Sequence, residues 1–219
     1  MENNIRIYCL KYAESVLPER MVFCGGDREK KIPISFAIYL IRFCDRNILV
    51  DAGCDTMPGF AMKDFRSPAD VLKQMGIAAG DITDVVITHA HHDHIEAIKH
   101  FSNAVVHISN AEYESGKSYI PNNRKVNIFE KEYCLAPQIK IIEYGGHSKG
   151  SAIVEIATAE AIYVIAGDEC YTDANIERKI CTGSFFNQEK AAAFVEKYND
   201  KKYRVYTSHD ISIKTERIL

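Results

Sequence analysis

The chain has 219 residues, and 47% of them are hydrophobic, which is enough apolar material for a continuous core. Acidic and basic side chains nearly cancel, leaving a formal net charge of -3 and no long run of Lys or Arg. This balance argues against binding to nucleic acid, which normally needs clustered cationic side chains to neutralise phosphates. No low-complexity linker divides the chain, so we expect a single domain over residues 1–219.

Short apolar runs rich in β-branched and aromatic residues predict β-strands along the whole chain. The runs in the first half lie at residues 5–10, 34–43, 47–53, 84–90 and 104–109. The runs in the second half lie at residues 139–144, 151–157, 161–168 and 203–209. Short polar connections at residues 44–46 and 158–160 predict two hairpins. We therefore expect sheets that are largely antiparallel or mixed.

Helix signals are fewer than strand signals. Residues 67–76 start with a Ser cap and a Pro at the first helical position, and they stop at a Gly. Residues 187–200 have an Asn cap, strong helix formers and a central apolar stripe. Two sets of strands, each followed by helices, fit two sheets packed face to face with helices outside. The expected fold class is an α+β sandwich.

The N-terminal segment and the cysteines bear on where the protein resides. Residues 1–15 are polar and of mixed charge, so they lack the basic start and apolar run of a secretory signal. No stretch approaches the roughly 20 apolar residues that a membrane-spanning helix needs. The 7 cysteines are an odd number without a CxxC pair, which favours neither a disulfide framework nor a thiolate metal site. We expect a soluble cytoplasmic protein.

The segment THAHHDH, residues 88–94, follows the apolar run DVVI and predicts a metal site. Alternate side chains of an extended segment share a face, so His89, His91 and Asp93 can converge. His94 can add a fourth ligand where the chain turns into a helix. Imidazole nitrogens and carboxylate oxygens suit Zn²⁺ and related ions. A solvated His cluster is the alternative, but packed groups left unliganded would cost about 1 to 3 kcal/mol each.

Three further residues, each at a predicted strand end beside a turn residue, can complete a site for two metals. His147 lies in EYGGHSKGS, Asp168 in VIAGDECY and His209 in YTSHD. A single His in such a place is more often structural than a ligand. The three together, in this order after the cluster, favour the functional interpretation.

This order resembles the metallo-β-lactamase superfamily, whose pattern is HxHxDH followed by a distant His, an Asp and a His. The resemblance extends from Val50 to Asp210 and implies a four-layer αβ/βα sandwich with the site at one edge of the two sheets. It implies two divalent metal ions, with zinc expected and Mn, Fe or Co as alternatives.

The resemblance also implies how the ligands divide between the two ions. One ion would be bound by His89, His91 and His147. The other would be bound by Asp93, His94 and His209. Asp168 would bridge the two ions, and Asp51 would fix a ligand histidine from behind. His92, His100 and His107 are assigned no metal role, and the roles of Cys54 and Cys170 stay open.

Such a site lowers the pKa of a shared water, and the resulting hydroxide attacks a carbonyl carbon. Asp93 would bind metal, hydrogen-bond the hydroxide and pass its proton to the leaving group. Two features resemble the N-acyl homoserine lactone lactonases. Tyr171 lies three residues after Asp168, and its hydroxyl would contact the substrate carbonyl; the chain also ends soon after His209.

Two features depart from the pattern. The segment between His94 and His147 is shorter than in the lactonases. Residues 95–97 are Ile-Glu-Ala, where Gly-Gly often follows the motif in the wider family.

The leading hypothesis is therefore a hydrolase that opens a small lactone or ester, with N-acyl homoserine lactones as the favoured class. The runner-up is a thioesterase of glyoxalase II type. A hypothesis of another class is a non-catalytic metal-binding protein, although the complete set of ligand types argues against it. The expected partners are a small-molecule substrate and a second copy of the chain in a homodimer, with no nucleic acid and no membrane.

Overall fold

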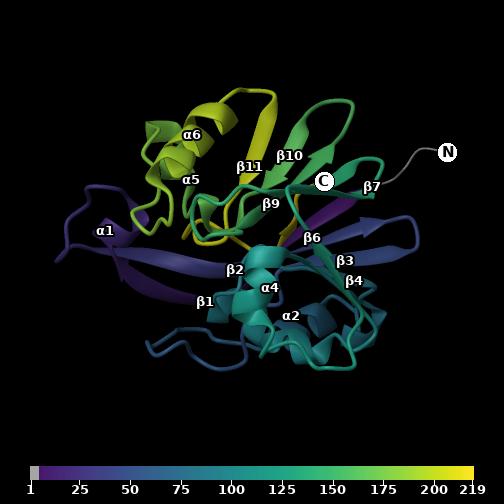
Figure 1. The fold of residues 1–219 in the computed structure, drawn as a ribbon. Coiled ribbons are helices and arrows are strands. Elements are labelled where there is room, and N and C mark those ends of the chain that lie inside the picture. The colour runs from purple at the N-terminus through teal and green to yellow at the C-terminus, as the bar shows by residue number, and fades with distance from the viewer. Residues whose placement is uncertain (1–4) are drawn as a thin grey trace.

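The computed structural model describes residues 5–219, which form two mixed β-sheets packed face to face with helices outside (Figure 1). One sheet has seven strands in the order β12-β1-β2-β3-β4-β5-β6. The other has five strands in the order β11-β10-β9-β8-β7. The α+β sandwich expected from the sequence is confirmed, while residues 1–4 of the predicted domain lie outside the described residues.

The seven-stranded sheet changes from antiparallel to parallel at β3. Its strands are β1 (Arg6–Pro18), β2 (Lys31–Phe43), β3 (Arg46–Val50), β4 (Asp84–Val86), β5 (Val105–Ser109), β6 (Val126–Phe129) and β12 (Glu216–Arg217). Strands β12 to β3 pair antiparallel, whereas β3 to β6 pair parallel. The carboxyl ends of β3, β4 and β5 therefore meet at one edge of the sheet.

The five-stranded sheet is antiparallel except at β11. Its strands are β7 (Glu132–Ala136), β8 (Ile139–Glu143), β9 (Ala152–Ala157), β10 (Ile162–Ile165) and β11 (Tyr203–Tyr206). Strand β11 runs parallel to β10. The hairpins predicted at residues 44–46 and 158–160 are both present, as β2 with β3 and β9 with β10.

Helices cover the outer face of each sheet. The α-helices are α1 (Glu19–Val22), α2 (Pro68–Gln74), α3 (His92–Ile95), α4 (Asn110–Gly116), α5 (Asp173–Arg178) and α6 (Gln188–Tyr198). The 3₁₀ turns are η1 (Ala79–Asp81), η2 (Glu96–His100) and η3 (Gly167–Glu169). In Figure 1, α2 and α4 lie on the side of the seven-stranded sheet, and α5 and α6 lie on the side of the five-stranded sheet.

The core has three layers of apolar side chains that follow from the alternation along the strands. Leu40 and Leu49 point to the helix side of the seven-stranded sheet and join a cluster with Leu72 of α2. Their neighbours Ile41 and Ile48 point the other way, into the interface between the sheets. A third cluster packs α6 against the outer face of the five-stranded sheet. Each fully buried side chain of this size stabilises the fold by about 1.5 to 3 kcal/mol.

The two predicted helices differ in how they begin. Asn187 caps α6 by accepting a hydrogen bond from the backbone N–H of Lys190 at 3.0 Å, as the sequence predicts. The capping bond predicted for Ser67 is wrong, because its hydroxyl donates to Oδ1 of Asp55 at 2.7 Å instead. Among residues 5–219, no helix is long and apolar enough to cross a membrane.

Candidate metal centre

After β4 the chain bends at Thr88 and again at His91, and the HxHxDH segment enters α3 at His92. Nε2 of His89 lies 3.0 Å from Nδ1 of His91, so these two imidazoles converge as alternation predicts. Asp93 and His94 already belong to α3. The prediction that alternation along an extended strand brings Asp93 onto the same face is therefore wrong, because the helical turn directs Asp93 elsewhere.

The seven predicted ligands come together as two neighbouring groups. Within each group, one donor atom per residue lies within 4.8 Å of the donor atoms of the others. The first group contains His89, His91, His147 and Asp168. The second group contains Asp93, His94 and His209. These residues come from the ends of both sheets, so the cluster lies where the edges of the sandwich meet.

Asp168 lies between the two groups and turns one carboxylate oxygen towards each. Its Oδ1 is 3.1 Å from Nε2 of His94 and 3.0 Å from Nε2 of His209. Its Oδ2 is 3.7 Å from Nε2 of His89 and 3.4 Å from Nε2 of His147. A carboxylate in this position has the geometry of a bridging ligand.

Two of the imidazoles are oriented by a hydrogen bond from Nδ1 to a backbone carbonyl. Nδ1 of His147 donates to the carbonyl of Ser184 at 2.7 Å. Nδ1 of His209 donates to the carbonyl of Ser35 at 2.9 Å. These bonds place the proton on Nδ1, which leaves the Nε2 lone pair free and directed into the cluster.

Five of the seven residues are buried, whereas His91 is exposed and Asp93 is half-buried, and two buried polar atoms of the cluster have no hydrogen-bond partner. Nε2 of His94 and Oδ1 of Asp168 form no hydrogen bond among the described residues. Burial lowers the pKa of His89 well below its usual value, with the neighbouring imidazoles adding to the effect. Burial alone would raise the pKa of Asp168, but the imidazoles of His94 and His209 outweigh it and hold that pKa well below the usual value. Imidazole nitrogens arranged around a carboxylate are a donor set that fits divalent cations.

Tyr171 follows η3 and packs against one histidine of each group. Its ring centroid lies 5.8 Å from that of His147 and 5.0 Å from that of His209. Burial, together with the negative charge of Asp168, raises the pKa of Tyr171 well above its usual value. The phenol therefore keeps its proton at neutral pH and can act as a hydrogen-bond donor beside the cluster.

Two buried glutamates beside the ligands were missed from the sequence. Oε1 of Glu169 accepts hydrogen bonds from the backbone N–H groups of Gly146 and His147, at 3.0 and 3.2 Å. Burial raises the pKa of Glu169 to about 7. Glu112 of α4 accepts from the backbone N–H of Ala90 at 2.8 Å. In the sequence, the only sign of these buried glutamates is an acidic residue among apolar and turn residues. That pattern alone does not predict burial.

Residues 37–209 match the family model of the metallo-β-lactamase superfamily. The matched range contains both groups of candidate ligands. The chain belongs to the metallo-β-lactamase superfamily. An N-acyl homoserine lactonase from Bacillus cereus is 28% identical over 153 residues, an alignment that covers 64% of this chain and 61% of the relative. The chain thus aligns with less than two thirds of that relative's length.

Two solved lactonase structures share the fold over nearly the whole chain. A quorum-quenching N-acyl homoserine lactone lactonase superposes with a TM-score of 0.85 at 22% identity, covering 100% of this chain and 99% of that one. A dizinc quorum-quenching lactonase, solved with a product bound, superposes with a TM-score of 0.78 at 19% identity, covering 96% of this chain and 89% of that one. At these identities the likeness concerns the fold.

The histidines given no metal role belong to neither group and have other partners. Nε2 of His92 lies 2.8 Å from the carbonyl oxygen of Thr56. His100 pairs with Asp55, and His107 pairs with Asp84 at 2.9 Å.

The two cysteines close to site residues in sequence are buried. Burial raises the pKa of Cys54 to about 12 and that of Cys170 well above its usual value, so both stay thiols.

Ile95, Glu96 and Ala97 stand where Gly-Gly often follows HxHxDH in the superfamily. Ile95 and Ala97 are fully buried in the core. Glu96 accepts a hydrogen bond from the backbone N–H of Asp55. An apolar side chain of β2 contacts the second group. The ring centroid of Phe36 lies 4.9 Å from that of His209 and 6.1 Å from that of Phe60, which is more exposed.

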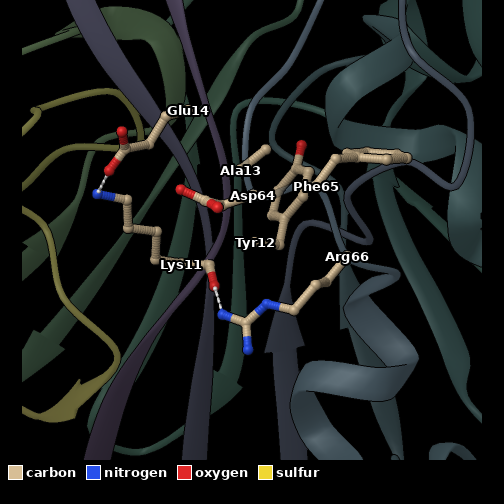
Figure 2. A pocket seen from close by; sticks show the side chains of 7 residues that line it. All are labelled: Lys11, Tyr12, Ala13, Glu14, Asp64, Phe65 and Arg66. Atoms are coloured by element: carbon tan, nitrogen blue, oxygen red, sulfur yellow. Dashed lines mark hydrogen bonds and ion pairs between the residues drawn. The ribbon is translucent and has the colours of Figure 1, made fainter.

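A cavity of about 530 Å³ lies beside β1 and contains none of the candidate ligands (Figure 2). It is lined by Lys11, Tyr12, Ala13, Glu14, Asp64, Phe65 and Arg66. In Figure 2, Lys11 pairs with Glu14, and Arg66 binds the carbonyl of Lys11. The hydroxyl of Tyr12 donates to the carbonyl of Asp93 at 2.8 Å, so Tyr12 holds the first turn of α3.

Proposed function

We propose that the chain is a dinuclear metal-dependent hydrolase that opens a small lactone or ester, with N-acyl homoserine lactones as the substrate class. The observation that carries the proposal is the position of Asp168, which turns one oxygen towards each of two groups of ligand-type side chains. The lactonase names of relatives at 28% identity and below support the substrate class.

The donor set fits two divalent cations, which we take to be zinc, with Mn, Fe or Co able to occupy the same ligands. His89, His91 and His147 would hold one cation, Asp93, His94 and His209 the other, and Asp168 would bridge them. Divalent cations at such a site supply acidified water and polarise a carbonyl oxygen. The orphaned Nε2 of His94 and Oδ1 of Asp168 are the atoms that most need such a partner.

Two side chains of this chain are placed to handle protons and orient the substrate. The Asp93 carboxylate is partly exposed beside His94 and His209, so it can accept a proton from the attacking water and deliver it to the leaving alkoxide. The protonated Tyr171 hydroxyl can donate a hydrogen bond to the substrate carbonyl oxygen. Both roles use groups that already face the cluster.

The remaining parts of the proposal concern partners and location. We infer one domain that acts on a small molecule, forms a homodimer and works in the cytoplasm without nucleic acid or membrane as a partner. The near balance of charge supports the absence of nucleic acid, and the lack of disulfides among the 7 cysteines supports a reducing compartment. Light scattering of the purified protein tests the dimer.

The experiment that tests the function combines elemental analysis for Zn, Mn, Fe and Co with a pH-indicator assay over lactones, thioesters and simple esters. About two metals per chain with preferential lactone opening is the expected result. Two metals with preferential thioester cleavage would replace the lactonase with a thioesterase of glyoxalase II type. Bound metal without turnover of any substrate indicates a metal-binding protein. No metal, bound or regained on reconstitution, overturns the proposal.

A further inference from the structure

Glu112 lies at a junction between the two chain segments that supply the histidines of the first group. The residue sits in the first turn of α4, directly after β5, and only 4% of it is exposed. Its carboxylate accepts three hydrogen bonds from outside its own helix. A buried carboxylate that accepts three hydrogen bonds has little freedom to move, which makes it suitable for fixing backbone segments relative to each other.

One oxygen of Glu112 binds the segment that carries His89 and His91. Its Oε2 accepts from the backbone N–H of Ala90 at 2.8 Å, and Ala90 is the residue between those two histidines. The backbone N–H of Ala90 is therefore held, and with it the position of the short segment that carries both imidazoles.

The other oxygen of Glu112 binds the segment that carries His147. Its Oε1 accepts from the hydroxyl of Ser148 at 2.7 Å and from the backbone N–H of Gly150 at 2.9 Å. Ser109, the N-cap of α4, adds a bond by donating to the carbonyl of Gly150 at 2.7 Å. A Cβ on Gly150 would collide with Ser109 and Ala111, so this loop packs directly on the first turn of α4.

We propose that Glu112 is a positioning residue that sets the distance between the His89–His91 segment and the His147 loop. It thereby fixes the geometry of one half of the metal centre. This inference rests on the proposed function, because it assigns Glu112 a role at the metal ion that the first group would bind. Glu112 makes none of its hydrogen bonds to Asp93, His94 or His209, so its effect is confined to that half.

The substitution Glu112→Gln tests the proposal with little change in volume. A carboxamide has one accepting oxygen, so its NH₂ must face either the N–H of Ala90 or the two donors of the His147 loop. Glu114→Gln is the matched control, because Glu114 lies two residues along the same helix and its carboxylate pairs only with the exposed Lys117. Both variants are compared with the wild type by thermal unfolding before any metal measurement.

The main readout is competition for metal between the protein and a chromophoric chelator, with Co²⁺ used as a spectroscopic replacement for both ions. We expect Glu112→Gln to bind one of the two ions about 10- to 100-fold more weakly, which is the usual effect of removing a group that supports metal ligands. The other ion, the Tm and the Glu114→Gln variant should stay near wild type. Excess metal should restore kcat with KM unchanged.

Two results would overturn the proposal: metal affinities of Glu112→Gln equal to those of Glu114→Gln, or equal weakening of both ions together with a lower Tm. If Glu112→Gln does not fold, Ser148→Ala removes one of the three hydrogen bonds to Glu112. This variant should lower the affinity for the same ion by a smaller factor. Unchanged affinity in Ser148→Ala also overturns the proposal. Failure of the proposed function is distinct from all of these, because it is seen in the wild-type protein, which would then bind no metal or would bind metal without turning over any substrate.

Discussion

Asp51 and His94 are joined by a short contact, with Oδ2 of Asp51 2.7 Å from Nδ1 of His94. Asp51 makes this contact from a backbone φ of 63°, in the left-handed region that non-glycine residues rarely occupy. Its carboxylate also accepts from the backbone N–H and the hydroxyl of Thr88, at 2.8 and 2.9 Å. The residue that follows β3 is thus strained, and it orients a candidate ligand through the nitrogen that faces away from the cluster.

Asp51→Asn should weaken metal binding at the second group. Asn tolerates the left-handed backbone and keeps the size of the side chain, but its amide cannot replace both carboxylate oxygens. We expect about a 10- to 100-fold loss of affinity for one ion, measured by chelator competition. Asp70→Asn, on the exposed face of α2, is the control. Equal affinities in the two variants would show that the Asp51–His94 contact does not support the site.

Tyr171→Phe should slow lactone opening while leaving metal content unchanged. The phenol stays protonated beside His147 and His209, so its loss removes a hydrogen-bond donor and no candidate ligand. Removing one such donor typically lowers kcat by about 100- to 1000-fold. Steady-state kinetics on lactones and thioesters, together with metal analysis, measure the effect. A variant with full lactonase activity would exclude the proposed contact between Tyr171 and the substrate carbonyl.

The sequence predicts the strands well where both faces of a strand are buried, and poorly at the sheet edges. Strands β6, β7 and β12 were missed; all three lie at sheet edges, and their solvent-facing residues interrupt the apolar pattern. The edge strand β11 was predicted, because its apolar residues are more continuous. Strand β4 is shorter than predicted because the chain turns at Thr88, whose backbone N–H binds Asp51 rather than a neighbouring strand.

The candidate site could be predicted to the extent that ligand types recur at recognisable spacings. His89, His91 and His147 fall in one group as the resemblance implies. Glu112 and Glu169 could not be found in this way, because their partners are backbone N–H groups of distant loops. Any residue except proline offers such a donor, so no sequence pattern marks the partner of a buried carboxylate.

Asp84→Asn should destabilise the protein near pH 7, by an amount that shrinks in acid. Asp84 is bound by the guanidinium of Arg46 and by His107 at 2.9 Å. Burial alone would raise the pKa of Asp84, but these partners outweigh it and hold the pKa well below its usual value. The folded-state pKa is depressed, so the stabilisation is present above the unfolded-state pKa of about 3.9 and is lost as pH falls towards the folded value.

Urea unfolding at several pH values measures this effect. We expect the variant to lose about 1.5 to 3 kcal/mol at pH 7, as is typical of hydrogen bonds to a charged group. The difference in free energy of unfolding between wild type and variant should become smaller as the pH is lowered below about 4. A gap that stays constant from pH 7 to pH 3 would mean that the charge of Asp84 contributes no stability.

Gly167→Ala should damage both stability and the metal centre, because Gly167 precedes Asp168 and has a φ of 52°. A Cβ at Gly167 would lie 2.9 Å from Cβ and Oγ1 of Thr88, the side chain that contacts both Asp51 and Nδ1 of His89. Gly76→Ala is the matched control, since Gly76 also has a positive φ, 75°, but open space around the added Cβ. Both changes should lower the free energy of unfolding by about 1 to 2 kcal/mol because of the backbone conformation.

Urea unfolding should show that Gly167→Ala loses about 1 to 3 kcal/mol more, because the added Cβ displaces Thr88. The same variant should bind metal more weakly. If the two variants lose the same stability and bind metal alike, the packing of Gly167 against Thr88 does not hold Asp168 in place.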